Sequence, residues 1–125
     1  MNSHVISSSL AALRHWRSVF GVLFTNGHDM LYQDTDLTEE RLVELVVHLD
    51  DIAYYFEQEK RNPDQISFGY DGGNLLLLLR GDLRLVLFHH DVAEVDELAR
   101  AAAAFLKDYG MSALVENRVS GSVPA

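Results

Sequence analysis

The spacing of hydrophobic residues along the chain is of two kinds, one typical of β-strands and one typical of α-helices. In the strand-like segments, apolar residues alternate with polar ones or run without interruption, and the segments end at glycine, asparagine or aspartate. Asn26-Gly27 separates two of these segments and accepts positive φ at low cost, so it predicts a β-hairpin. The pattern predicts five strands, over residues 19–25, 30–33, 66–70, 75–79 and 83–88.

Three other segments carry apolar residues at helical spacing. A first helix is expected from a cap at Ser8 or Ser9, because a serine hydroxyl accepts a hydrogen bond from a free backbone N–H of the first turn. A long helix is expected from a Thr38 cap to about Lys60. The last helix is expected over 93–109, with Gly110 as its stop.

The order of these elements predicts a layered α/β fold. The last three strands are joined by short turns, so they should be antiparallel neighbours. The strand over 75–79 is apolar on both faces and needs cover on both sides, which favours a sheet sandwiched between helices. We expect a flexible segment over 1–9, a single domain over 10–110 and a frayed tail over 111–125.

The long helix carries two apolar stripes. At about 100° per residue, one broad side can face a core. A second group, Val43, Val47 and Tyr54, lies well away from that side, and we call it the outer stripe. Scattered apolar residues are normal on a protein surface, but a stripe along three turns favours an interface. The core-facing residues are Leu42, Leu45, Val46, Leu49, Ile52, Ala53 and Phe56.

The outer stripe predicts a homodimer with two-fold symmetry. The short strand over 66–70 has small residues on one face, so it is a candidate edge strand that could pair with a second chain. The predicted dimer interface therefore combines both segments: Val43, Val47, Tyr54, Ile66, Phe68 and Tyr70.

Composition and charge exclude several classes of function. The chain has 125 residues, no cysteine, and 19 acidic against 10 basic side chains, for a net charge of −9. Such a surface repels the phosphates of nucleic acids and of anionic membranes, so we expect neither as a partner. The start is polar and no apolar run is long enough to cross a bilayer, so we expect a cytoplasmic protein.

Motifs that could support chemistry are few, and each has a structural explanation. His89-His90 are adjacent in a strand and point to opposite faces, so they cannot share a metal. Asp50-Asp51 diverge by about 100° on a helix and cannot share a proton. Asp34-x-Asp36 lacks the later ligands of a calcium loop. We therefore expect no enzyme, no metal and no cofactor.

A protein is the partner that this surface fits best. Tyrosine offers contact area at modest entropic cost, and acidic side chains would orient a partner rich in lysine or arginine. The candidate contacts are Asp50, Asp51, Tyr54 and Tyr55. The alternative reading, in which Tyr54 serves only the dimer and Tyr55 only covers a helix flank, is equally compatible with the sequence.

Three local patterns resemble the roadblock family, which includes the dynein light-chain roadblock proteins and bacterial gliding-GTPase partners. They are the strand and hairpin of 19–27, the apolar strands of 73–79 and 83–88, and the alanine-rich helix of 98–106. The resemblance covers about residues 8–110 and implies a profilin-like architecture. In this architecture a five-stranded antiparallel sheet lies between the long helix and the two terminal helices.

The resemblance also implies a function. It implies a homodimer joined through the long helices and the edge strand before Asp71, acting as a non-catalytic scaffold or regulator of small Ras-like GTPases, or as a motor-complex light chain. Two alternatives are an acidic secretion-type chaperone and a small-ligand sensor. Only two strands precede the long helix, where such chaperones usually have three, and the leucine-filled middle strand leaves little room for a ligand cavity.

Overall fold

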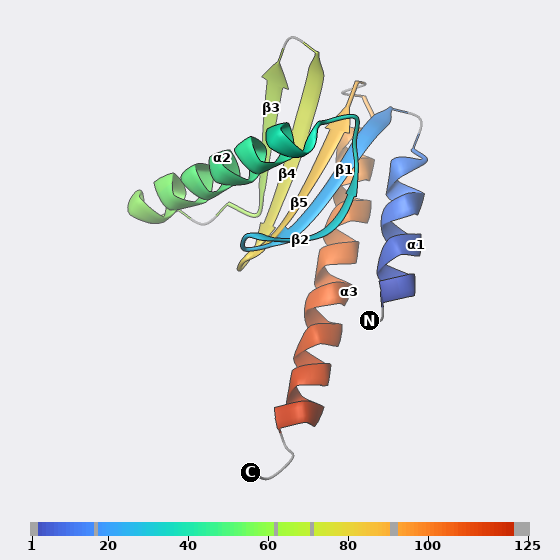
Figure 1. Ribbon diagram of the computed structural model, residues 1–125, viewed down its shortest axis with the longest axis vertical. Helices are drawn as coiled ribbons and strands as arrows, with labels where there is room; N and C mark the ends of the chain where they lie inside the picture. The colour runs from blue at the N-terminus through green and yellow to red at the C-terminus, as the bar shows by residue number, and fades with distance from the viewer. Residues whose placement is uncertain (1–2, 17, 62, 71, 91–92, 122–125) are drawn as a thin grey trace.

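Short turns join strands that are apolar on both faces, and together they form one sheet with helices on both faces (Figure 1). The structure is a computed structural model. It describes residues 3–16, 18–61, 63–70, 72–90 and 93–121, and the side chains at 3, 4, 70 and 112–121 are outside this description. The elements are α1 (Ser3–Arg14), β1 (Val19–Asn26), β2 (Asp29–Asp34), α2 (Glu39–Gln58), β3 (Gln65–Tyr70), β4 (Gly73–Arg80), β5 (Leu83–His89) and α3 (Val95–Gly121).

All neighbouring strands pair antiparallel, in the order β2-β1-β5-β4-β3. Three pairs are hairpins, and β1 joins β5 at the centre, where Phe24 lies opposite Leu85. The turns at Gly27 and Gly81 have φ of 58° and 60°, a conformation that glycine adopts without steric cost. Strands β2 and β3 are therefore the two edges of the sheet, as predicted for β3.

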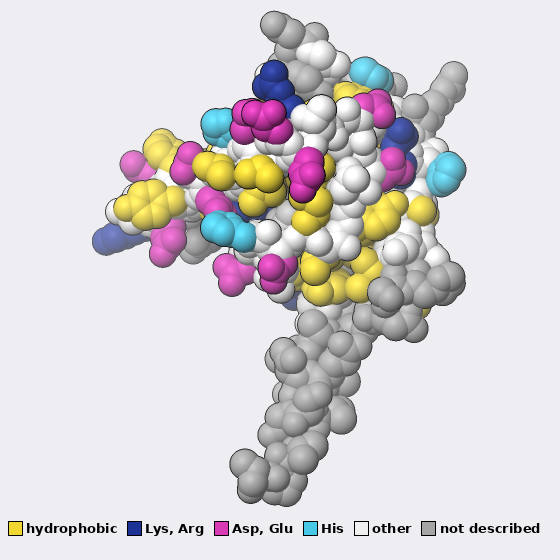
Figure 2. Space-filling model, viewed as in Figure 1, with side chains coloured by type: hydrophobic (Ala, Val, Ile, Leu, Met, Phe, Trp, Pro, Cys, Tyr) yellow, Lys and Arg dark blue, Asp and Glu magenta, His cyan; other side chains and the backbone are white. Residues whose placement is uncertain are grey.

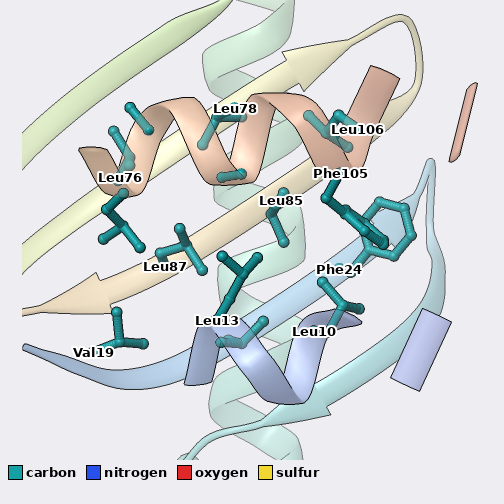
Figure 3. Close-up of a cluster of buried hydrophobic side chains, with 14 residues drawn as sticks. Leu10, Leu13, Val19, Phe24, Leu76, Leu78, Leu85, Leu87, Phe105 and Leu106 are labelled. Carbon is teal, nitrogen blue, oxygen red and sulfur yellow. The ribbon is translucent and has the colours of Figure 1, made fainter. Parts of the chain in front are cut away.

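One face of the sheet is covered by α1 and α3. Figure 3 shows leucines of β4 and β5 pointing toward these helices, with Phe24 of β1 against Phe105 of α3. The two rings pack edge to face with centroids 5.2 Å apart. The buried members of this cluster are Leu10, Leu13, Val19, Val22, Phe24, Leu76, Leu78, Leu85, Leu87, Leu98, Ala99, Ala102, Phe105 and Leu106.

The opposite face is covered by α2 alone. Its core-facing stripe packs on the central strands, where Leu49 is only 1% exposed. The buried members here are Leu23, Leu42, Leu49, Leu77 and Val86, a smaller set than on the other face. Both faces of the central strands are thus removed from water. The predicted fold class, a five-stranded antiparallel sheet between one long helix and two terminal helices, is confirmed.

Both ends of α2 are closed by local hydrogen bonds, of which the sequence predicts the N-terminal one. The Thr38 hydroxyl accepts a hydrogen bond from the Arg41 backbone N–H at 3.2 Å, as predicted for an N-cap. The helix ends at Gln58, two residues before the predicted end. Lys60 has a φ of 56°, and the Arg61 N–H donates to the Phe56 carbonyl at 2.9 Å, which closes the last turn.

Helix α1 begins earlier than predicted. It starts at Ser3, so Ser8 and Ser9 lie inside the helix and the predicted cap is wrong. Residues 3–9, expected to be flexible, are helical. Ile6 lies one turn before Leu10 and packs against the same buried cluster, which gives the added turns an apolar contact.

Helix α3 continues through the glycine that was expected to end it. It runs to Gly121, so the predicted stop at Gly110 is wrong, and residues 111–121, expected to be frayed, are helical beyond the sheet (Figure 1). A Cβ on Gly110 would lie 3.1 Å from Nε of Arg80. The glycine lies inside α3 beside the flexible side chain of Arg80 and does not terminate the helix.

Replacing Thr38 with alanine should lower the free energy of unfolding by about 1 kcal/mol, because the Arg41 N–H loses its acceptor. Thr38→Ser keeps the hydroxyl and is the control. Urea denaturation at neutral pH measures both variants. Equal stability of the two variants would contradict a capping role for this side chain.

Candidate interaction surfaces

The outer stripe of α2 is exposed, as predicted. Val43, Val47 and Tyr54 are 57%, 52% and 63% exposed, whereas the core-facing side of the same helix packs on the sheet. Figure 2 shows hydrophobic side chains along the outer face of α2, with acidic side chains on their flanks. The role of this stripe as a dimer interface stays a prediction.

The N-terminal half of the outer stripe borders a groove beside the β1–β2 hairpin. The groove has a volume of about 200 Å³ and is lined by His28, Met30, Val43, Val46 and Val47. We call it the hairpin groove. Met30 projects from β2, an edge strand, and is 42% exposed. The sequence analysis missed this groove because β2 and α2 approach each other only after folding.

The rest of the predicted dimer interface lies at the opposite edge of the sheet. Strand β3 is the last strand beyond β4, so one side of its backbone has no neighbouring strand in the described chain. Phe68 is 38% exposed, while Ile66 packs partly against the cluster under α2. The Tyr70 side chain lies outside the described residues. The predicted interface as a whole stays a prediction, with Val43 and Val47 beside the hairpin groove and Phe68 at the β3 edge.

Asp50 pairs with two basic side chains from distant parts of the chain. Nη1 of Arg84 on β5 donates to its carboxylate, and Nε2 of His28, in the hairpin turn, contacts the other oxygen. Arg84 is 8% exposed, whereas His28 is largely in solvent. Burial alone would raise the pKa of Asp50. The hydrogen bonds and positive charges of Arg84 and His28 outweigh it and hold that pKa below its ordinary value.

Neither Arg84 nor His28 was among the predicted site residues. Strand β5 contained a signal for Arg84, because an arginine within an otherwise apolar strand requires an acidic partner when it is buried. His28 had no comparable signal. It follows the hairpin glycine, and turn preference alone explains its position in the sequence.

Three of the four predicted partner contacts are exposed. Tyr54 and Asp51 are on the surface of α2, and so is Tyr55, whose ring also packs edge to face on Phe56 at 5.3 Å. Asp50 differs because its carboxylate already accepts from Arg84 and contacts His28. The structure gives Asp50 an intramolecular role that the sequence analysis did not anticipate.

The described residues show no arrangement typical of a catalytic or metal centre. Among them, no cluster of three or more histidine, aspartate or glutamate side chains could hold a metal ion. A groove of about 530 Å³ lies between the end of α2 and the β4–β5 turn, and its charged lining combines Glu57, Asp64 and Asp82 with Arg61, Arg80 and Arg84. No helix in the described part of the chain has the length and apolarity needed to cross a membrane.

Comparison with solved structures decides the fold. The crystal structure of the Roadblock/LC7 domain from Streptomyces avermitillis matches this chain with a TM-score of 0.60 and 15% sequence identity. The match covers 82% of this chain and 96% of that domain. The chain has the Roadblock/LC7 fold. Comparison of the sequence with protein-family models and with curated proteins gives no match.

The Roadblock/LC7 fold confirms the resemblance drawn from the sequence. The strand and hairpin of 19–27, the paired strands β4 and β5, and the alanine-rich part of α3 all lie where that resemblance implied. At 15% identity the likeness establishes the architecture alone. Partner and activity must be argued from the surfaces of this chain.

Replacing Asp50 with asparagine should lower the free energy of unfolding at pH 7 by about 1–3 kcal/mol, because buried Arg84 loses its counter-charge. This loss of stability is smaller than the loss expected for a fully buried ion pair, because the Asp50 side chain is 30% exposed. The native pKa of Asp50 is depressed, so its contribution to stability is present above the unfolded pKa, about 4, and is lost as pH falls through the native pKa.

The difference between the wild type and Asp50→Asn should therefore narrow when urea denaturation is repeated at about pH 3. Asp51→Asn is the matched control, because Asp51 is the exposed neighbour on the same helix. We expect its stability to stay within about 0.5 kcal/mol of the wild type. A loss of equal size in both variants would show that the Arg84 pair is not the cause.

Proposed function

We propose that the protein is a non-catalytic scaffold that forms a homodimer and binds another protein, with a small Ras-like GTPase or a motor complex as the partner class. The Roadblock/LC7 fold supports an interaction role in general. The specific partner class comes from the family resemblance of the sequence. The observation that carries the dimer proposal is the open edge of β3.

The chemistry of the two edge strands favours β3 as the dimer contact. Strand β2 begins and ends with aspartate, and two copies of it would bring these charges together. Strand β3, with the sequence Gln-Ile-Ser-Phe-Gly-Tyr, carries no charge. A second copy could pair its β3 antiparallel to this one and extend the sheet through a two-fold axis. Phe68 is the exposed apolar residue that such a contact would cover.

The surface chemistry supports a protein partner. The net charge of −9 repels phosphates, which disfavours nucleic acids and anionic membranes. Asp50, one of the carboxylates considered for chemistry, is instead held by Arg84 and His28. An acidic surface with exposed tyrosines suits a partner with basic residues.

The two alternative functions have less support. Strands β1 and β2 alone precede α2, which differs from the three strands usual before the middle helix of secretion-type chaperones. A small-ligand sensor would need a cavity in the core. The space between α2 and the sheet is instead filled by the side chains of Leu23, Leu49, Leu77 and Val86.

Phe68→Glu should shift the protein from dimer to monomer in sedimentation velocity at tens of micromolar, because two glutamates would face each other across the two-fold axis. Leu31→Glu on β2 is the matched control. Leu31 is 40% exposed and Phe68 is 38% exposed, but they lie at opposite edges of the sheet. A monomeric wild type, or equal effects of both variants, would contradict dimerisation through β3.

The partner class is tested by titration calorimetry with purified small Ras-like GTPases from the same genome, each loaded with GDP or a non-hydrolysable GTP analogue. We expect stoichiometric binding of at least one of them, with a preference for one nucleotide state. If none binds while RNA or DNA copurifies as the main ligand, the scaffold proposal fails.

A further inference from the structure

We propose that the groove between the end of α2 and the β4–β5 turn binds a small zwitterion that carries a carboxylate, an ammonium group and an apolar body, as an apolar amino acid does. We call this groove the turn groove. Its volume of about 530 Å³ lies within the usual range of small-molecule sites, about 300–1,000 Å³. The proposal goes beyond the scaffold function and does not depend on it.

The turn groove is separate from the contacts proposed for the dimer. Its lining from α2 includes Ala53 and Phe56, which belong to the core-facing side of that helix. Residues two positions apart on a helix lie about 160° apart around its axis, so Tyr54 of the outer stripe and Phe56 point to nearly opposite sides. Among the described residues, none from β3 lines the groove. The buried residues that fill the space under α2 do not line it either.

Arg84 brings an unpaired donor to the groove. Its side chain is 9% exposed, and its Nη1 donates to Asp50 of α2. Its Nε is buried and has no hydrogen-bond partner in the described part of the chain. An unpaired buried donor is costly, and a guanidinium presents its N–H groups in a fork that fits a carboxylate. Arg84 therefore supplies the position for the carboxylate of the ligand.

Arg61 places a second guanidinium at the groove. Its guanidinium carbon lies 5.3 Å from the centre of the Phe56 ring, and its backbone N–H donates to the Phe56 carbonyl at 2.9 Å. A cation over a ring face is attracted by the negative charge of that face. Across the residues that the structure describes, Arg61 forms no ion pair. Its charge is therefore held in place and available to a ligand carboxylate.

Three carboxylates of the lining exclude a simple anion. Glu57, Asp64 and Asp82 are exposed, and no ion pair joins them to an arginine within the described ranges of the chain. A ligand with negative charge alone would be attracted by the arginines and repelled by these acids. An ammonium group a few bonds from the ligand carboxylate turns that repulsion into attraction. Three acidic and three arginine side chains therefore favour a zwitterion over an anion or a cation.

The rest of the lining is apolar and suits an apolar ligand body. It consists of Ala53, Phe56, Pro63 and Leu79, of which Phe56 and Leu79 are half-buried. Covering their exposed parts would remove apolar surface from water. The Leu79 N–H donates to the Asp64 carbonyl at 2.9 Å, which fixes this wall to β4. A preformed wall loses less conformational entropy when a ligand binds.

The probe for the test is L-phenylalanine, and two analogues each lack one of its charges. The analogue 3-phenylpropionate has no ammonium group, and phenethylamine has no carboxylate. NMR titration of the ¹⁵N-labelled wild type measures affinity and maps the contact. We expect L-phenylalanine to bind with a Kd of about 1 mM or lower, and each analogue to bind about tenfold more weakly.

The Nε–Hε signal of Arg84 reports the proposed carboxylate contact directly. It should shift when L-phenylalanine or a high concentration of 3-phenylpropionate is added, because both carry the carboxylate that would accept from Nε. It should not shift with phenethylamine. This measurement uses the wild type, so it does not depend on whether a variant folds.

Two matched pairs of variants test the charged groups. Arg61→Gln should weaken binding of L-phenylalanine by about fivefold and Lys60→Gln should change it little, because both residues are exposed but only Arg61 lines the groove. Glu57→Gln and Glu59→Gln form the second pair for the same reason. Arg61→Gln should also narrow the preference for L-phenylalanine over phenethylamine, and Glu57→Gln its preference over 3-phenylpropionate.

Four results would overturn the proposal: no binding of L-phenylalanine at about 10 mM, equal affinities for the three compounds, shifts that avoid the groove, or groove signals that depend on protein concentration without ligand. The last result would show that a second copy covers the groove. Sedimentation measures the dimer separately. Failure of the ligand test with an intact dimer therefore rejects the groove alone, and a monomer that binds L-phenylalanine rejects the dimer alone.

Discussion

One constraint governs this fold: the central strands of the sheet are apolar on both faces, so both faces must be covered. Leu76 and Leu78 of β4 point toward α1 and α3, while Leu77 between them points toward α2. Leaving either row in water would cost about 1.5–3 kcal/mol for each side chain. The helices cover the two faces of the sheet to different extents. Two helices cover one face with a large buried cluster, and a single helix covers the other, so the margins of that second face are the surfaces available for interaction.

The ion pair of Asp50 and Arg84 shows how α2 is positioned on its face. Aliphatic contacts alone permit a helix to slide or rotate, because leucine packing is only weakly directional. A buried arginine on β5 needs a carboxylate nearby, and Asp50 provides it. His28 extends the same contact to the hairpin. The pair therefore ties α2 to β5 at one point, in addition to the apolar contacts of Leu42 and Leu49 with the sheet.

The two exposed surfaces considered for binding, the outer face of α2 and the edge of β3, differ in charge. The outer face of α2 combines the apolar outer stripe with acidic side chains, whereas the strand at the β3 edge is uncharged. Val43 and Val47 border the hairpin groove and β3 forms one edge of the sheet, so the two parts of the predicted dimer interface come from different elements of the fold.

The sequence by itself determined the order of the elements, the layered fold, the Thr38 cap and the two stripes of α2, because each follows from hydrophobic period and local backbone preference. It misplaced the ends of α1 and α3: packing of Ile6 accompanies the earlier start of α1, and α3 continues through Gly110 to Gly121. Only the tertiary structure joined His28, Asp50 and Arg84 and formed the hairpin groove. These residues are 22 and 34 positions apart, and no periodic pattern records a contact over such separations.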